Sequence, residues 1–175
     1  GIAPRTPDIP GIGHPMVVPY IDAILGRKPV GKRVAIIGAG GIGFDVAELV
    51  SHEGTSAALD IEIFAREWGI DFKNHPRGGV TGVQPQVAKA EREVILLQRK
   101  AEALGKTLGR TTGWTHRMVL QRRGVTMIGG VEYLKIDEAG LHTRINGEAR
   151  LLEVDTVIVC AGQTSQRALY DELQQ

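Results

Sequence analysis

Residues 33–48 read Arg-Val-Ala-Ile-Ile-Gly-Ala-Gly-Gly-Ile-Gly-Phe-Asp-Val-Ala-Glu: an apolar run, three glycines in G-x-G-x-x-G spacing, and an amphipathic segment. The order of strand, tight turn and helix is typical of dinucleotide-binding βαβ units. In such a unit Gly38 permits the turn, and Gly40 lets a pyrophosphate approach the backbone. Gly43 allows the helix to pack closely on the strand.

The helix that follows the glycines should add to this site. Its first N–H groups have no partners within the helix, and they lie at the positive end of the helix dipole. Both features favour the negative charge of a phosphate. We therefore predict that a contiguous segment binds the pyrophosphate of a dinucleotide, namely Gly38, Ala39, Gly40, Gly41, Ile42 and Gly43.

Composition limits the classes of function. The 175 residues are 42% hydrophobic, which suits one domain with an ordinary core. The formal net charge of +1 gives no reason to expect a nucleic-acid partner. A single cysteine, Cys160, excludes an internal disulfide and an iron–sulfur cluster held by this chain alone. We expect no membrane segment and no metal site, and a cytoplasmic location, because apolar runs of about 18 residues, clustered histidines and a signal peptide are all lacking.

The rest of the chain alternates strand and helix patterns. After the strand at 33–37 and the helix at 41–52, we expect a strand at 94–97, a helix at 113–123 capped by Thr112, and a strand at 125–128. Alternating segments at 131–136, 141–145 and 150–154 then precede a last apolar strand at 156–160, and Asn146-Gly147 indicates a hairpin turn. The predicted fold class is α/β, a Rossmann-like βαβαβ parallel sheet with an antiparallel β-meander.

The ends of the chain differ from this middle part. Residues 1–32 are rich in Pro and Gly and indicate a connector, with a possible short helix at 16–25. We therefore expect the chain to be a segment of something larger, with a nucleotide-binding domain at 33–163, an insertion at 53–92 and a return segment at 164–175.

The sequence offers two interpretations of the residue that recognises the adenosine ribose. If residues 61–64 are the second strand, Arg66 occupies the recognition position; if residues 94–97 are, Gln98, Arg99 and Lys100 occupy it. Both interpretations place a base where NAD-binding units carry an acid, which favours the 2′-phosphate of NADP. We prefer the second, because residues 60–68 also fit a helix.

Other residues contribute weaker signals. Ala161 and Gly162 follow the last strand, so they should line the same crevice, on the nicotinamide side. Thr111, near the start of the 113–123 helix, either touches the nucleotide or belongs to a helix cap. Cys160 ends an apolar strand and is expected to be a buried, inert thiol. No nucleophile with a base and no pair of carboxylates stands out, so we predict no catalytic residue.

Several motifs resemble those of bacterial NADPH-dependent 2,4-dienoyl-CoA reductases, members of the old-yellow-enzyme-related group that includes trimethylamine dehydrogenase. The resemblance spans nearly the whole chain. It is carried by the glycine segment and by Glu67-Trp-Gly-Ile-Asp71, Leu96-Leu-Gln-Arg-Lys100, Thr111-Thr-Gly-Trp-Thr-His-Arg117, Tyr133-Leu-Lys-Ile-Asp137 and Ile145-Asn-Gly-Glu148. The first and last residues resemble the segments that leave and re-enter a flavin domain.

The resemblance implies an NAD(P)H domain inserted into the flavin domain of a flavoprotein with two dinucleotide sites. It further implies FAD, FMN and a [4Fe–4S] cluster in the parent enzyme, none of them held by this fragment, and a flavin domain of the same parent chain as the partner. The expected role is electron input for reduction of a dienoyl thioester, with NADP(H) bound here. Alternatives are the same module in an amine dehydrogenase or enoate reductase, and a stand-alone nucleotide-binding module.

Overall fold

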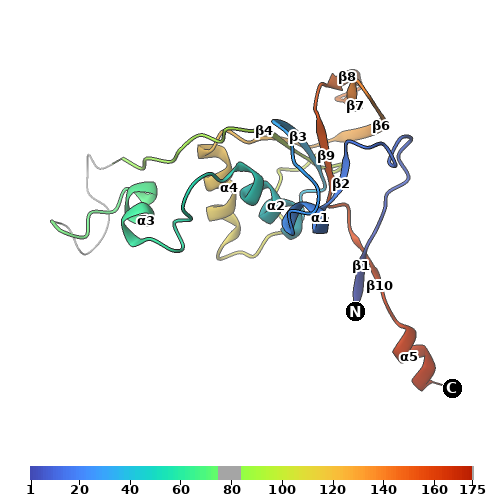
Figure 1. The fold of residues 1–175 in the computed structure, drawn as a ribbon, viewed down its shortest axis with the longest axis horizontal. Coiled ribbons are helices and arrows are strands. Elements are labelled where there is room, and N and C mark those ends of the chain that lie inside the picture. The colour runs from blue at the N-terminus through green and yellow to red at the C-terminus, as the bar shows by residue number, and fades with distance from the viewer. Residues whose placement is uncertain (75–83, 175) are drawn as a thin grey trace.

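A computed structural model describes residues 1–74 and 84–174 (Figure 1). In chain order its elements are β1 (Ile2–Pro4), β2 (Val17–Pro19), α1 (Tyr20–Ile24), β3 (Arg33–Ile37), α2 (Gly41–Ser51), α3 (Ile61–Trp68), β4 (Glu93–Leu97), α4 (Gly113–Arg122), β5 (Thr126–Ile128), β6 (Val131–Asp137), β7 (Gly140–Ile145), β8 (Glu148–Leu152), β9 (Thr156–Val159), β10 (Gln163–Ser165) and α5 (Ala168–Leu173).

The central sheet is parallel, with strand order β2-β9-β3-β4-β5. β3 is its middle strand and pairs with β4 on one side and β9 on the other. The strands β6, β7 and β8 form a separate antiparallel meander, and β1 pairs with β10 in a two-stranded ribbon. This ribbon extends from the sheet and places the two chain ends near each other (Figure 1). The predicted α/β class with a parallel sheet and a meander is confirmed.

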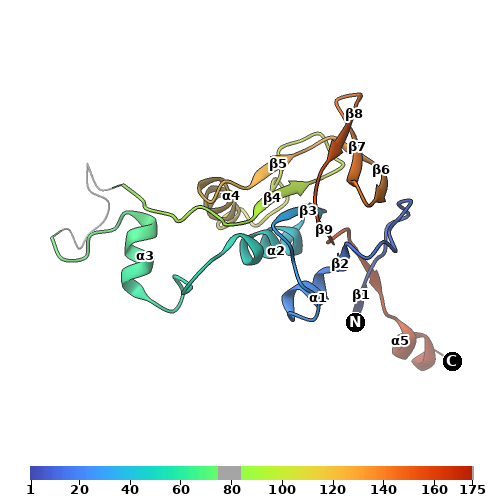
Figure 2. The same ribbon diagram turned by 45° about the horizontal axis from the view of Figure 1, so that its top comes forward.

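Each face of the sheet carries its own core, because successive side chains of a strand point to opposite faces. Val34 and Ile36 of β3 pack with Phe44, Val46 and other apolar residues of α2, and with Leu120 of α4. The intervening residues of β3 pack with the meander instead. Figure 2 shows α2 and the meander on opposite sides of the sheet. The molecule therefore has three layers: the helices, the sheet and the meander. Neither core covers the carboxyl ends of the strands.

Most of the predicted elements are present. β3 has the predicted bounds, and α2, β4, α4 and β9 agree with the prediction to within one residue at each end. β4 is the neighbour of β3 and therefore the second strand of the βαβ unit. The turn at Asn146 and Gly147 has the positive φ angles, 53° and 86°, that a tight hairpin of this type requires.

Some elements differ from the prediction. The expected helix at 16–25 is a strand followed by a short helix, because Val17 and Val18 join the edge of the sheet beside β9. Residues within the predicted connector thus belong to the parallel sheet. β8 begins earlier than predicted, at Glu148. Thr112 occupies the N-cap position of α4, but its side chain makes no capping hydrogen bond.

Between α2 and β4 the described residues form one helix, α3, which lies apart from the sheet (Figure 1). The Asp60 carboxylate caps α3 by accepting from two N–H groups of its first turn. The alternative of a strand at residues 61–64 is therefore wrong, since the capped helix occupies those residues. Part of the predicted insertion, residues 75–83, lies outside the described residues. Among the residues that are described, no helix combines the length and hydropathy needed to cross a bilayer.

Candidate dinucleotide-binding site

A cleft of about 570 Å³ opens at the carboxyl ends of β3, β4 and β9. It is the place where ligands bind in open α/β sheets, outside the carboxyl ends of the parallel strands. The lining residues come from five separate parts of the chain: Arg5, Ile37, Gly38, Gly40, Gly41, Ile42, Gln98, Arg99, Tyr133, Cys160, Ala161, Gly162 and Gln163.

Gly38 makes the turn out of β3 with a φ of 106°, a conformation that side chains other than glycine's disfavour. Its N–H donates to the Leu97 carbonyl at 2.9 Å. A Cβ at this position would lie 2.6 Å from the carbonyl oxygen of Cys160. Gly38 therefore ties the ends of β3 and β4 together and passes close under the end of β9.

The other two glycines of the motif have different surroundings. A Cβ on Gly43 would lie 1.8 Å from the Gly38 carbonyl oxygen, so this glycine brings α2 against the turn. A Cβ on Gly40 or Gly41 would meet nothing within 4 Å. These two glycines thus leave open space at the start of α2, where no side chain caps the helix. The open space and the amide donors of the first turn fit a pyrophosphate.

A smaller hollow of about 200 Å³ adjoins the cleft and shares Gly40, Gln98 and Arg99 with it. The remaining residues of the small hollow are Ala39, Lys100, Glu102, Ala103, Lys106 and Thr107. Arg99, Lys100 and Lys106 supply three cationic side chains against the single carboxylate of Glu102. The sequence analysis anticipated Arg99 and Lys100 but not Lys106 and Glu102.

Glu102 lies between the two lysines of this small hollow. Its carboxylate is 3.0 Å from Lys106 Nζ and 3.8 Å from Lys100 Nζ. The hydrogen bond from Lys106 is the main reason why the pKa of Glu102 is lowered, so the carboxylate is charged at neutral pH. Glu102 therefore partly neutralises the positive charge of the small hollow.

Gln98 shapes the loop that carries these cations. Its Nε2 donates to the carbonyl oxygens of Lys100 at 3.0 Å and Glu102 at 2.5 Å. The backbone supports the same loop, since the Gly130 N–H donates to Lys100 and the Val131 N–H donates to Gln98. The amide of Gln98 is thus engaged with its own loop, although the residue lines both hollows.

The far rim of the cleft is formed by Ala161, Gly162 and Arg5. Arg5 donates to the Ala161 carbonyl through Nε at 3.1 Å and Nη2 at 3.0 Å. Gly162 has a φ of 90°, and a Cβ there would meet the guanidinium of Arg5. The predicted Ala161 and Gly162 therefore line the cleft as expected. Arg5 was missed, because nothing in a Pro-rich segment indicates that it returns to the strand ends.

Cys160 also lines the cleft, but its thiol is largely buried. Burial raises the pKa of Cys160 to about 12, so almost no thiolate forms at neutral pH. Within the described residues, no three His, Cys, Asp or Glu side chains converge in a way that could hold a metal ion.

Two residues weighed in the sequence analysis lie elsewhere. Thr111 lines neither the cleft nor the small hollow, and its carbonyl accepts a hydrogen bond from Trp114 Nε1 at 3.0 Å. Arg66 lies on α3 and also lines neither. The residues that follow the second strand of the βαβ unit, β4, are consequently Gln98, Arg99 and Lys100.

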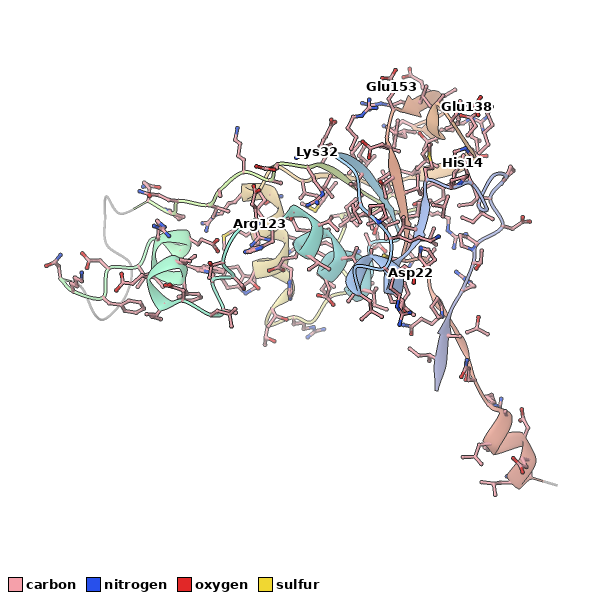
Figure 3. All side chains as sticks on the ribbon, viewed as in Figure 1. His14, Asp22, Lys32, Arg123, Glu138 and Glu153 are labelled. Carbon is pink, nitrogen blue, oxygen red and sulfur yellow. The ribbon has the colours of Figure 1, made fainter. Side chains whose placement is uncertain are left out.

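A second large hollow, of about 560 Å³, lies between α2, α3 and α4. Arg123, labelled in Figure 3, lies beside α2 and donates to the Glu48 carbonyl at 3.0 Å. His116 of α4 contacts the carboxylate of Glu48 at 3.3 Å. These contacts join α2 to α4, so they support the helical layer rather than the cleft at the strand ends.

Comparisons with known proteins agree with this architecture. A family model described as pyridine nucleotide-disulphide oxidoreductase matches residues 1–175. A metal reductase from Desulforamulus reducens is 27% identical over 174 residues, which is 99% of this chain and 25% of that protein. The chain thus spans about a quarter of the length of this relative.

Solved structures show the same fold. The structure of a 2-naphthoyl-CoA reductase in complex with 2-naphthoyl-CoA superposes with a TM-score of 0.68 at 20% identity, covering 98% of this chain and 20% of that one. The water-forming NADH oxidase from Lactobacillus brevis, bound to NADH, gives a TM-score of 0.57 at 20% identity. The match covers 98% of this chain and 31% of the oxidase.

Proposed function

Because the chain belongs to the pyridine nucleotide-disulphide oxidoreductase family, we propose that it binds NADPH in the cleft at the ends of β3, β4 and β9. In this proposal it is the electron-input domain of a flavin-dependent oxidoreductase. NADPH supplies a hydride when bound. The chain's own residues bind and orient the nucleotide, and none of them takes part in bond making.

One observation carries this proposal: the glycine turn that fits a pyrophosphate adjoins a hollow with three cations. Gly40 lines both spaces, and so does Arg99. A pyrophosphate at Gly40, Gly41 and Ile42 would leave the adenosine ribose near the end of β4, where Arg99 and Lys100 begin the basic loop. A guanidinium can bind a phosphate in bidentate fashion, and an ammonium adds a mobile charge.

The partner we propose is a flavin domain of the same parent chain. The ribbon of β1 and β10 and the helix α5 extend away from the sheet (Figure 1), and α5 exposes Leu169, Tyr170 and Leu173. Exposed apolar side chains on a projecting element are typical of a docking surface. In this proposal the part of residues 1–32 that precedes β2 and residues 164–175 are the connecting segments, and the location is cytoplasmic.

For the parent reaction we propose reduction of a C=C bond in a 2,4-dienoyl-CoA, with FAD, FMN and a [4Fe–4S] cluster held outside this chain. The motif resemblance supports it, and so does the similar fold of a reductase whose structure holds a different acyl-CoA thioester, 2-naphthoyl-CoA. A second candidate is metal-ion reduction, which the metal reductase favours at 27% identity. Assaying the full-length protein with NADPH and either a dienoyl-CoA or a metal ion distinguishes the two.

The test of nucleotide binding is a calorimetric titration of the protein with NADPH and with NADH. We expect NADPH to bind at least about tenfold more tightly, since a hydrogen bond to a charged group contributes about 1.5–3 kcal/mol. The preference should weaken at high salt, because the cations are exposed and ions screen them. The Arg99→Ala/Lys100→Ala variant should lose the preference while keeping its affinity for NADH.

Arg27→Ala/Lys28→Ala is a matched control, because it removes the same charge from residues that line neither hollow. It should retain the preference for NADPH. Equal affinity of the unmodified protein for both nucleotides would contradict NADPH specificity. The lack of any binding to a folded sample would contradict the nucleotide site itself.

A further inference from the structure

Tyr133 of β6 is a residue of the cleft that neither the glycine motif nor the basic loop explains. Its ring packs against the apolar core between sheet and meander, and the residue lines the cleft beside Ile37 and Arg99. Among the described residues, its hydroxyl oxygen is buried and has no hydrogen-bond partner. Buried polar groups are normally paired, so a hydroxyl without a partner in a ligand cleft calls for an explanation.

The backbone of β6 directs this side chain toward the sheet. The pairing of β6 with β7 shifts register between Tyr133 and Lys135, so Leu134 is an extra residue on β6. Without the shift, alternation would place Tyr133 and Ile136 on opposite faces of the strand. With it, both pack in the core beneath the meander. Bulges of this kind often turn a side chain toward a functional site.

The hydroxyl of Tyr133 is protonated at neutral pH, because burial raises its pKa, an effect that the nearby charge of Arg99 only partly opposes. It can therefore donate a hydrogen bond as well as accept one. The neighbouring polar groups of the cleft make no hydrogen bond with this hydroxyl, because they have other partners. Arg5 donates to Ala161, and Gln98 donates within its own loop.

We propose that the hydroxyl of Tyr133 hydrogen-bonds to the adenosine half of the bound nucleotide. This inference rests on the proposed function. With the pyrophosphate at Gly40 and the 2′-phosphate at Arg99, the adenosine lies between them, over the ends of β3 and β4. Tyr133 faces that space with Ile37, so its ring forms an apolar wall and its hydroxyl supplies the polar contact.

The test compares the wild-type protein with Tyr133→Phe, which removes the hydroxyl and keeps the ring. The probes are NADPH and adenosine 2′,5′-bisphosphate, which carries the adenosine half without the nicotinamide. We expect the dissociation constants of both probes to rise by the same factor, about threefold to tenfold, as for loss of one hydrogen bond. Tyr20→Phe is the matched control, because Tyr20 packs on the opposite, helical face of the sheet, and it should bind both probes normally.

Thermal unfolding of the unliganded proteins provides a second measurement. Since the hydroxyl has no partner before the nucleotide binds, Tyr133→Phe should melt at the wild-type temperature or above it. A lower melting temperature would show that the hydroxyl is already paired within the protein, and would overturn the inference.

The binding results separate the two proposals. Unchanged binding of both probes by Tyr133→Phe would refute the role of Tyr133 and leave the nucleotide site standing. Weaker binding of NADPH alone would place the contact on the nicotinamide half and refute the adenosine assignment. If the wild-type protein binds neither probe, the proposed function fails, and the inference about Tyr133 fails with it.

Discussion

Replacing Gly43 by alanine tests whether close packing of α2 on the glycine turn holds this fold together. The added Cβ would lie 1.8 Å from the carbonyl oxygen of Gly38 and 2.9 Å from its carbonyl carbon. An ordinary contact begins at 3.4 Å, so the helix and the turn must separate by about 1.6 Å. The obstructing atoms are backbone, which has no rotamer to change, and Phe44 and Val46 of the same helix are buried against the sheet.

We expect Gly43→Ala to destabilise the protein by about 3 kcal/mol, the upper end for overpacking a core, because the packing of the whole helix shifts. For a domain of this size that corresponds to a fall in melting temperature of roughly 6–12 °C. Thermal unfolding followed by circular dichroism measures it directly. Nucleotide binding should weaken in the same variant, since the shift moves the first turn of α2.

Gly41→Ala is the matched control, two residues away on the same helix. Its Cβ would have no atom within 4 Å, and alanine is a better helix former than glycine by about 0.5–1 kcal/mol. The control should melt at or slightly above the wild-type temperature. If Gly43→Ala melted as the control does, the close contact between α2 and the turn would not exist in solution, and the reasoning would be refuted.

Three further predictions concern the cleft and the meander. Gly40→Ala should fold normally, since its Cβ meets open space. Calorimetry should nevertheless show at least about tenfold weaker NADPH binding, because the added methyl group obstructs the pyrophosphate. Normal NADPH binding by this variant would place the pyrophosphate elsewhere. Cys160, whose pKa burial raises to about 12, should react with iodoacetamide at pH 8 at least ~100-fold more slowly than in the unfolded chain, and rapid labelling would show that the thiol is accessible. Hydrogen bonds from Lys135 and His142 lower the pKa of Asp137 below its ordinary value of 3.8. The ionised carboxylate therefore stabilises the fold above that pH, and this contribution is lost as the pH falls through the folded pKa. Urea unfolding should therefore find Asp137→Asn less stable than wild type at pH 7, with a gap that narrows below pH 3.8; a constant gap would contradict the assignment.

The local parts of the site follow directly from residue types and spacing. Gly38 makes the turn and Gly43 the close packing that the motif predicts, because a tight turn between strand and helix constrains only neighbouring residues. The hairpin at Asn146 and Gly147 is predictable for the same reason. The basic residues after β4 could be placed once residues 94–97 were preferred as the second strand.

Other residues of the cleft were not predictable from their neighbours in sequence. Arg5 and Tyr133 have ordinary surroundings in the chain, and each reaches the cleft through a long-range pairing. Arg5 arrives with the ribbon of β1 and β10, and Tyr133 arrives through the shifted register of β6. A one-residue shift reverses the face on which a strand side chain lies, and the alternating pattern of β6 does not reveal the shift.

The sequence by itself determined the fold class, the glycine turn at 38–43 and the basic segment that follows the second strand, because these depend on backbone conformation, periodicity and charge over short distances. Tertiary structure decided that β2 joins the sheet, that Glu102 offsets the lysines of the small hollow, and that Tyr133, whose hydroxyl is buried, lines the cleft. Those outcomes depend on which strands pair and in which register. Pairing is settled by burial of both faces of the sheet at once, and no short stretch of sequence contains that information.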